Sequence, residues 1–230
     1  MQHAEGLPVG FEVPDWQPRE RPPRTTLAGR YCRLEPLDPD RHSEALFTAC
    51  QLDSAGLNWT YLPYGPFPDI AAYRQWVEEV CSRDDPLFFA IVDSTEGAVG
   101  VASYLRIDPS VGSIEVGHIN YSPLLQRRRS GTEAMYLLMR RAFDELGYRR
   151  YEWKCDALNA VSRRAAERLG FVYEGTFRQA TIYKGRNRDT AWYAIIDSQW
   201  PKIRHAMEAW LDPSNFDSNE LQRTRLCVSE

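Results

Sequence analysis

The sequence predicts a mixed α/β fold, in which helices flank a central, mostly antiparallel sheet within a single domain. Three β-rich runs follow one another at residues 87–93, 98–107 and 113–121, separated by short turns that contain Gly, Ser or Pro. A basic turn at 126–132 then leads into a long amphipathic helix, which is followed by a strand at 149–156 and a second capped helix. Antiparallel strands followed by alternating helices and strands are typical of a mixed sheet with helices on its faces.

The composition is that of an ordinary soluble, globular chain, and it excludes several classes of protein. Of the 230 residues, 43% are hydrophobic and 26% are charged, so the chain can bury one sizeable core with appendages. No apolar run approaches the roughly 18 residues of a membrane span, and the first residues lack the pattern of a secretion signal. The net charge of −4 argues against a general nucleic-acid binder. We therefore expect no membrane or nucleic-acid partner.

The cysteines indicate a reducing compartment. The five cysteines form no CxxC pair and are odd in number, which argues against a disulfide framework. Four of them lie in apolar patterns typical of buried, reduced thiols, namely those at positions 32, 50, 81 and 155. We expect a cytoplasmic protein without a metal site.

Residues 1–29 are expected to form an extended, Pro-rich arm ahead of the domain at 30–200. The arm holds five of the 15 prolines and shows neither a helical nor an alternating period. Phe11 and Trp16 would pack it on its own domain or on the second subunit of a possible homodimer; partial disorder is the third alternative. A C-terminal helix and polar tail, 201–230, would follow the domain.

The domain should begin with a strand at 30–37 and two helices. The first helix starts at Asp38-Pro39-Asp40, and a second is expected at 69–82. The apolar positions expected on the inner faces of these two helices are Ala45, Leu46, Ala49 and Leu52, and then Tyr73, Trp76, Val77 and Val80.

The loop at 56–67 between these helices is rich in aromatic residues. Two prolines and two glycines exclude a regular helix there, yet Trp59, Tyr61, Tyr64 and Phe67 all fall within it. Such a loop either plugs the core or forms the wall of a substrate pocket. The sequence leaves both alternatives open.

The stretch 124–171 is the most informative part of the chain. It carries eleven Arg or Lys against six Asp or Glu. Its turn, Gln126-Arg127-Arg128-Arg129-Ser130-Gly131-Thr132, opens a helix, where free backbone N–H groups and the helix dipole favour an anion, most plausibly a pyrophosphate. Arg140, Arg141 and Arg168 are interpreted instead as solvated residues of helix faces. The buried face of the first helix is expected at Met135, Leu138, Met139, Ala142, Phe143 and Leu146, with Gly147 as its stop.

The rest of the domain follows from similar signals. In the strand at 149–156, Tyr151, Trp153 and Cys155 alternate with Glu152, Lys154 and Asp156. Asn159 is suited to cap the second helix, whose inner residues would be Val161, Ala165 and Leu169 before a stop at Gly170. A hairpin of 171–183 and 189–197, a helix at 200–211 and a polar tail at 212–230 complete the chain.

With these motifs in that order, the chain resembles the GNAT superfamily of acyl-CoA-dependent N-acetyltransferases. The branch it resembles is that of the ribosomal-protein N-terminal alanine and serine acetyltransferases. The family loop, Gln/Arg-x-x-Gly-x-Gly/Ala, often followed by Thr-Glu-Ala, stands here at 126–134. A second element, Asn-x-x-Ser/Ala with a later Leu-Gly-Phe-x-x-Glu-Gly, stands at 159–175. The resemblance covers about 30–200 and implies that the fourth and fifth strands of the sheet splay apart.

Two positions depart from the family pattern. Arg129 replaces the first glycine of the loop, where it would carry modest strain if that position needs φ > 0. Its guanidinium could also add to phosphate binding. Ala166 stands where many members have a tyrosine that acts as general acid.

The resemblance implies acetyl-CoA as cosubstrate and assigns residues to it. Asn120, Tyr121 and Leu124 would flank the pantetheine in the gap between the splayed strands. The turn residues Gln126, Arg127, Arg128, Arg129, Ser130, Gly131 and Thr132 would hold the phosphates. Asn159 and Ser162 would face the lower arm of the cofactor.

The resemblance also suggests the groups that move protons. Glu115, in the fourth-strand run, is the candidate general base, acting through water on the acceptor amine; a solvent-facing glutamate is the alternative. Strand alternation points His118 to the opposite face unless a bulge at Gly117 re-aims it. Ser162 is the candidate proton donor to the departing thiolate, although it could simply support the Asn159 cap.

The acceptor would be a primary amine, either a protein N-terminus or a small molecule. Its pocket is expected between the 56–67 loop, the second helix and the last hairpin, because clustered aromatic rings attract an ammonium group. The residues assigned to this pocket are Trp59, Tyr61, Tyr64, Tyr183 and Arg186. A non-catalytic acyl-CoA-binding module is the main alternative function, and a regulatory protein without CoA is the other.

Overall fold

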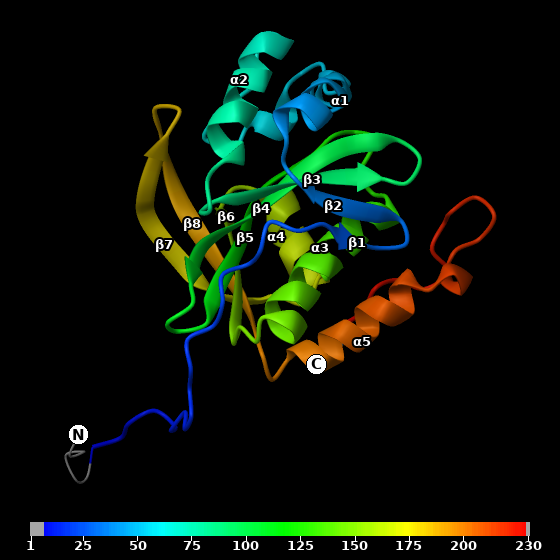
Figure 1. Ribbon diagram of the computed structural model, residues 1–230. Coiled ribbons are helices and arrows are strands. Elements are labelled where there is room, and N and C mark those ends of the chain that lie inside the picture. Colours follow the sequence, from blue (N-terminus) through cyan, green and yellow to red (C-terminus); the bar gives the residue numbers. More distant parts are fainter. Residues whose placement is uncertain (1–6, 229–230) are drawn as a thin grey trace.

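The computed structural model describes residues 7–228 and shows one sheet with helices on both faces (Figure 1). The helices are α1 Pro39–Gln51, α2 Ile70–Cys81, α3 Arg129–Arg140, α4 Ala160–Arg168 and α5 Trp200–Leu211. The strands are β1 Leu27–Ala28, β2 Cys32–Pro36, β3 Leu87–Asp93, β4 Gly97–Asp108, β5 Ser113–Tyr121, β6 Arg150–Asp156, β7 Val172–Tyr183 and β8 Arg186–Ile196. Short 3-10 turns occur at Leu57–Trp59 and Pro213–Asn215, and a π-helical turn, Arg141–Glu145, extends α3.

The sheet has eight strands in the order β1-β2-β3-β4-β5-β6-β8-β7, and all of its pairs are antiparallel except β5 with β6. That pair is parallel because α3 returns the chain to the same end of the sheet before β6 begins. The prediction of a mixed, mostly antiparallel sheet flanked by helices is therefore confirmed. The predicted splay is also present, since the β5–β6 ladder ends at the pair Val116 and Trp153.

Two helical layers cover the sheet (Figure 1). Helices α1 and α2 pack on one face through an aromatic cluster that includes Trp59, Tyr73, Trp76 and Phe88. Helices α3, α4 and α5 pack on the other face around the larger core. The inner residues predicted for α2, and those predicted for α3 other than the half-buried Leu146, are all buried.

Several predicted inner positions prove wrong. Leu52 lies just past the end of α1 and is 57% exposed, while Ala45 is also exposed; His42 and Ser43 are buried in their place. Val161 is 70% exposed because α4 buries its other side, centred on Ala166. The other predicted inner residues are correct, since Leu46, Ala49 and Leu169 are buried and Ala165 packs against the core, so the errors lie at the ends of the predicted faces.

Two arginines interpreted as solvated form structural contacts, although Arg168 is also exposed. Arg141 is buried, and its Nη1 donates to the carbonyl oxygen of Thr25 at 3.0 Å. Arg168 donates from Nη1 to Oγ1 of Thr132 at 3.1 Å and lies over the ring of Trp210. The first contact ties the N-terminal arm to the end of α3, and the second ties α4 to the start of α3.

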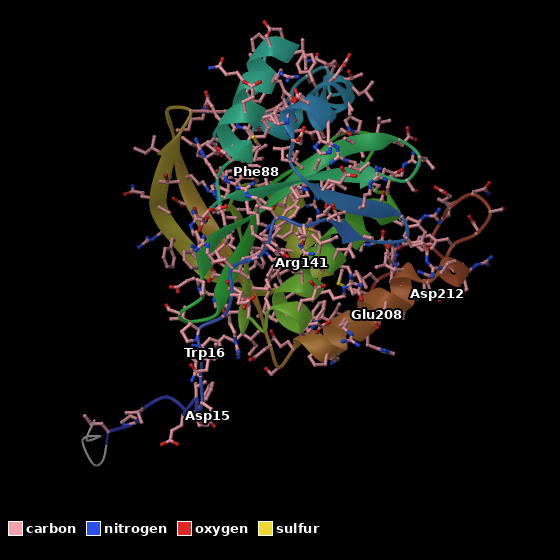
Figure 2. The ribbon with its side chains drawn as sticks, viewed as in Figure 1. Asp15, Trp16, Phe88, Arg141, Glu208 and Asp212 are labelled. Carbon is pink, nitrogen blue, oxygen red and sulfur yellow. The ribbon has the colours of Figure 1, made fainter. Side chains whose placement is uncertain are left out.

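The N-terminal segment reaches the domain at Trp16, which Figure 2 shows beside the lower end of the sheet, whereas residues 7–15 are exposed and extend away from it. The Trp16 indole donates to the carbonyl oxygen of Ser110 at 2.7 Å, whereas Phe11 is 82% exposed. The segment after α5 packs Phe216 against Tyr31 and buries Leu226. Within residues 7–228, no helix is both long enough and apolar enough to cross a bilayer.

Candidate functional site

The central feature of the site is the gap that opens where β5 and β6 part. Beyond Val116 and Trp153, β5 continues to Tyr121 paired only with β4, and β6 continues to Asp156 paired only with β8. The facing edges of the two strands are therefore left without a ladder, and their backbone N–H and C=O groups can bind an extended ligand. Helix α3 begins behind this gap and α4 follows β6, so both helix starts belong to the same region.

A β-bulge shapes the β5 side of the gap. The register runs from Val101 opposite Asn120 to Ser103 opposite Gly117, so β5 contains one residue more than β4 between these pairs. His118 takes up the irregularity with a φ of +51°. The bulge turns its ring onto the α1–α2 side, where it stacks on Tyr64 and lies 5.1 Å from the ring of Phe88. The simple alternation that placed His118 on the opposite face is therefore wrong.

The His118 imidazole is held neutral by its surroundings. Burial, followed by the positive field of Arg106, Arg188 and Arg83, lowers the pKa of His118 to about 4. Its Nδ1 lies 3.1 Å from the Tyr64 hydroxyl. The phenol of Tyr64 thus orients the ring. No acidic group contributes to this shift, so nothing raises the pKa of His118 against the effect of the three arginines.

Glu115 lies under the same surface of β5, two residues before the bulge. It is only 3% exposed, and its Oε2 accepts from Nη1 of Arg106 at 2.8 Å and contacts Nζ of Lys154 at 2.9 Å. Burial raises the pKa of the Glu115 carboxyl, while Lys154 and Arg106 act against that rise. Because both cations contact Oε2, Oε1 is the oxygen that remains for a water or an amine. The alternative of a solvent-facing glutamate is excluded by its burial.

Asn120 is a buried amide without a partner. It is 4% exposed, and neither its Oδ1 nor its Nδ2 forms a hydrogen bond within residues 7–228. An unsatisfied buried amide on the edge of the gap costs free energy that a ligand with its own amides could recover. Pantetheine contains two such amides, so this position fits the predicted cosubstrate.

The turn before α3 forms an uncapped helix start. Arg128 occupies the N-cap position without a side-chain hydrogen bond, so the first N–H groups of α3 lack a side-chain acceptor. Gly131 is packed so closely that a Cβ there would lie 2.9 Å from the Tyr121 ring. The Tyr121 hydroxyl also donates to the Gly131 carbonyl oxygen at 2.8 Å. The arrangement fits an anion at the helix start.

The predicted strain at Arg129 is misplaced. Arg129 is the first residue of α3, and the left-handed residue of the turn is Arg127, with a φ of +61°. Arg127 forms no ion pair with any residue between 7 and 228, and its exposed side chain remains available to a ligand.

Arg128 and Arg129 contact the C-terminal segment. Nη2 of Arg129 lies 2.7 Å from Oε1 of Glu220, and its guanidinium stacks 4.2 Å above the Tyr31 ring and 5.4 Å from that of Phe216. Arg128 contacts the same Glu220 at 3.7 Å. The triplet is therefore divided, with one free arginine and two that contact a carboxylate of the chain itself.

The other residues assigned to the cosubstrate have mixed surroundings. Gln126 turns back and donates from Nε2 to Oδ1 of Asn58 and to the Tyr121 carbonyl oxygen, so it fastens the turn. Leu124 is half-buried against the core, and Ser130 is buried with a hydroxyl that has no partner within residues 7–228. Thr132 is buried and accepts from Arg168.

The start of α4 places a serine hydroxyl beside the gap. Asn159 caps the helix as predicted, with Oδ1 accepting from the Ser162 N–H at 3.0 Å. The Ser162 hydroxyl oxygen accepts from the Trp153 indole N–H at 2.9 Å. Because Trp153 can only donate, the hydroxyl proton of Ser162 is left for another acceptor. Ala166 is fully buried in the helix interface.

The residues predicted for the acceptor pocket are only partly brought together. Trp59 is 5% exposed within the aromatic cluster, so this side chain plugs the core. Tyr64 contacts His118, and Tyr61 donates to the carbonyl oxygen of Leu158 at 3.3 Å. The Tyr183 hydroxyl donates to Oδ2 of Asp156 at 2.9 Å. Of the two alternatives for the loop, Trp59 therefore supports the plug, while Tyr61 and Tyr64 line the region of the gap.

Arg186 does not join this group, because it is exposed at the tip of the β7–β8 hairpin. Arg188, two residues further into β8, is the arginine near the gap: its Nε donates to Oγ1 of Thr190 at 3.1 Å and its guanidinium lies 5.8 Å from the Tyr183 ring. Strand alternation could have suggested it, since residues two apart share a face.

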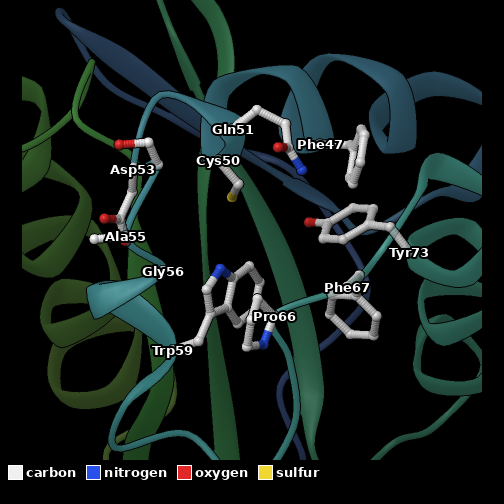
Figure 3. Close-up of a pocket in the computed structure, with 11 residues that line it drawn as sticks. Phe47, Cys50, Gln51, Asp53, Ala55, Gly56, Trp59, Pro66, Phe67 and Tyr73 are labelled. Atoms are coloured by element: carbon white, nitrogen blue, oxygen red, sulfur yellow. The ribbon is translucent and has the colours of Figure 1, made fainter.

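A separate cavity of about 180 Å³ lies behind the aromatic loop (Figure 3). It is bounded by the end of α1, the turn at 53–56 and α2, with Cys50, Trp59 and Tyr73 in its lining. It therefore lies on the outer side of the aromatic cluster rather than between β5 and β6.

Comparison with known proteins gives a consistent result. A family model described as "Acetyltransferase (GNAT) domain" matches residues 32–172. A solved GCN5-related N-acetyltransferase from Brucella melitensis is 47% identical, with a TM-score of 0.91 over 93% of this chain and 97% of that one.

Two curated relatives match over shorter regions. An uncharacterized N-acetyltransferase, YokL, of the SPbeta prophage in Bacillus subtilis is 29% identical over 116 residues, which are 50% of this chain and 64% of that protein. The ribosomal-protein-serine acetyltransferase of Escherichia coli is 32% identical over 106 residues, 44% of this chain and 56% of that protein. The matched region thus spans less than two thirds of each of these relatives.

Proposed function

Because the chain belongs to the GNAT family of acetyltransferases and is therefore an acyltransferase, we propose that it moves an acetyl group from acetyl-CoA to a primary amine. The observation that carries this proposal is the gap between β5 and β6, with the uncapped start of α3 beside it. A gap with unpaired strand edges next to an anion site suits a long ligand that carries amides at one end and phosphates at the other.

The proposed cosubstrate contacts follow the sequence prediction with two changes. The unpartnered amide of Asn120 would bind the pantetheine, between Tyr121 and Leu124 on one side and Asn159 on the other. Arg127 and the free N–H groups of 129–131 would bind the pyrophosphate. Gln126 would hold the turn in shape. To bind the phosphates, Arg129 would have to leave Glu220, and Arg128 would have to leave Glu220 and Glu96.

In the proposed reaction the amine nitrogen attacks the thioester carbonyl directly in a ternary complex, forming the N–C bond as the C–S bond breaks. The amine must lose one proton and the departing thiolate must gain one. Glu115 would accept the first proton at Oε1 through a water, since its raised pKa makes it a better base than an exposed glutamate. Ser162 would donate the second from its hydroxyl, whose oxygen is oriented by Trp153.

The proposal also covers the class of acceptor and the cellular compartment. The likeness to a ribosomal-protein-serine acetyltransferase keeps a protein N-terminus as one acceptor class, and small amines are the other. All five cysteines are free, which suits a reducing compartment, so we place the protein in the cytoplasm.

The test is an acceptor screen by release of free thiol from acetyl-CoA, with N-terminal peptides and small amines. Wild type should be stabilised by acetyl-CoA and should acetylate at least one acceptor. E115Q should lower kcat by roughly 100-fold or more and remove the acidic limb of the pH–rate profile. E152Q is the matched control, because Glu152 neighbours the same Lys154.

S162A tests the donor. It should lower kcat by about 10- to 100-fold and leave acetyl-CoA binding nearly unchanged. An E115Q enzyme as active as wild type, with its acidic limb intact, would rule out the base assignment. Wild type that is stabilised by acetyl-CoA but turns over no acceptor would rule out the proposed activity itself.

A further inference from the structure

Arg188 is an arginine near the gap that no carboxylate of residues 7–228 neutralises. Its Nε donates to the Thr190 hydroxyl, and Thr190 stands opposite Asp156 at the end of β6. The Tyr183 ring lies 5.8 Å from its guanidinium. The bond to Thr190 uses one of five N–H donors, so the remaining face of the guanidinium is available to a ligand.

The acidic groups nearby are already bonded elsewhere. Asp156 accepts from the Tyr183 hydroxyl at Oδ2 and from the Leu158 N–H at Oδ1. Glu115 is paired with Arg106 and Lys154. Within residues 7–228 none of these carboxylates forms an ion pair with Arg188, so its guanidinium can pair with an anionic ligand. A guanidinium without a carboxylate partner attracts an anion.

Two contacts bridge the region above the gap. Nζ of Lys184, at the hairpin tip, donates to the Trp59 carbonyl oxygen at 2.7 Å. On the other side, the Tyr61 hydroxyl donates to the Leu158 carbonyl oxygen. The aromatic loop is thus fastened to the β7–β8 hairpin and to the segment between β6 and α4. An acceptor chain that continued outward between these elements would have to break one of the two bonds.

We propose that the acceptor is a small amine that carries its own anionic group, a carboxylate or a phosphate, and that Arg188 binds that group. The inference rests on the proposed acetyl transfer and names the acceptor class for the same site. A planar guanidinium binds a carboxylate or a phosphate through two parallel N–H bonds, which would fix the amine at a set distance from Arg188. The bridging contacts favour such a small acceptor over an extended peptide N-terminus, which would have to break one of them.

The experiment compares amine acceptors with and without an anionic group. One arm uses amino acids against their amides, a second uses phosphoethanolamine against ethanolamine, and a third uses peptides with the same N-terminal residues. The anionic member of at least one pair should have the higher kcat/KM by roughly 10- to 100-fold. The first two arms distinguish a carboxylate from a phosphate.

The variant pair is R188Q and R186Q. R188Q should raise KM for the anionic acceptor by roughly 10- to 100-fold and leave the neutral partner unchanged, because only the anion contacts the guanidinium. R186Q removes a charge from the same strand at its exposed tip and should change neither. Equal rates for charged and neutral members, or peptides as the best acceptors, would overturn the inference.

A binding measurement keeps the inference testable if no acceptor is turned over. N-acetyl amino acids and N-acetylphosphoethanolamine should raise the thermal midpoint of wild type more than their neutral counterparts at equal ionic strength. R188Q should lose that difference while R186Q keeps it. Absence of turnover with the expected binding would count against the proposed activity alone, and equal binding of charged and neutral products would count against the role of Arg188.

Discussion

At the scale of single residues, the extra residue in β5 has the largest effect on the site. It gives His118 a positive φ and brings its ring to the face that also carries Glu115. The two side chains packed against this ring, Tyr64 and Phe88, are aromatic, and burial with the field of three arginines lowers the pKa of His118, so the imidazole stays neutral near pH 7. A neutral ring can accept a hydrogen bond at the gap without adding a further positive charge beside Arg106 and Arg188.

The lowered pKa of His118 predicts a pH dependence of stability. The unfolded chain binds a proton at this histidine near pH 6.5, whereas the folded chain binds it near pH 4. The free energy of unfolding should therefore be highest above pH 6.5 and fall as the pH drops toward 4. The expected loss is about 2 kcal/mol, reduced for the partial exposure of His118 to solvent. Urea unfolding at pH 7.0, 6.0 and 5.0 would measure it, with H118Q as the variant that should flatten the curve. A curve equally steep in H118Q would refute the assignment.

Within α3, substitution of Glu133 should lower the free energy of unfolding strongly. Its buried carboxylate accepts three backbone N–H groups, those of Arg30, Tyr31 and Cys32, at 2.6–2.8 Å. E133A would leave these donors unpaired at the start of β2 and should lower the free energy of unfolding by about 3 kcal/mol. E79A, on the exposed side of α2, is the control and should change it by less than about 0.5 kcal/mol. A loss no larger than that of the control would show that water replaces the carboxylate.

At the scale of elements, the local signals of the sequence predicted most of what is present. Proline and acidic caps set the starts of α1 and α2, and Gly147 ends the helical segment with a φ of +68°. Only Val161 was wrongly placed on the inner face of α4, because nine residues leave few apolar positions to define the edge of a face. The bulge at His118 had no pattern of its own, since Gly117 marked only a place where one could occur.

The turn before α3 was also only partly predictable from the sequence. Its composition predicted an anion site, but not which arginine takes the left-handed conformation or which arginines face inward. Those depend on Glu220 and Phe216, about 90 residues further along the chain. Sequence spacing carries no information on contacts at that separation.

Arg127 and Arg129, one exposed and one docked on the C-terminal segment, therefore make a matched pair for mutation. R129G removes the stacking on Tyr31 and the pair with Glu220, and should lower the free energy of unfolding by about 1–2 kcal/mol while speeding hydrogen exchange at 216–222. R127G should be nearly neutral, because relief of the positive φ offsets the added freedom of the unfolded chain. Equal effects of the two substitutions, or unchanged exchange in R129G, would contradict the docking role of Arg129.

At the scale of the whole molecule, the two helical layers on the faces of the sheet contribute to different parts of the proposed site. One layer, α1 and α2 with the aromatic loop, covers the side of Glu115, His118 and Arg188, where the acceptor is proposed to bind. The other layer supplies the starts of α3 and α4 (Figure 1). The order of helices and strands along the chain followed from local patterns. Trp16 was among the residues expected to pack the arm on its own domain or on a second subunit, but its partner Ser110, 94 residues away, could not be predicted from the sequence.

The contact between Glu220 and the two arginines has a consequence for how ionic strength acts on the protein. A phosphate that binds Arg128 and Arg129 must displace the carboxylate of Glu220, so binding neutralises little additional charge. Added salt screens the attraction of the arginines for the phosphate and for Glu220 to a similar degree. The affinity for acetyl-CoA should thus fall only gently between low and high salt. In E220Q the exchange is lost at Arg129, while Arg128 keeps its 3.8 Å contact with Glu96. The same titration should then give a tighter complex at low salt and a steeper decline; parallel curves would show that Glu220 stays in place when the cosubstrate binds.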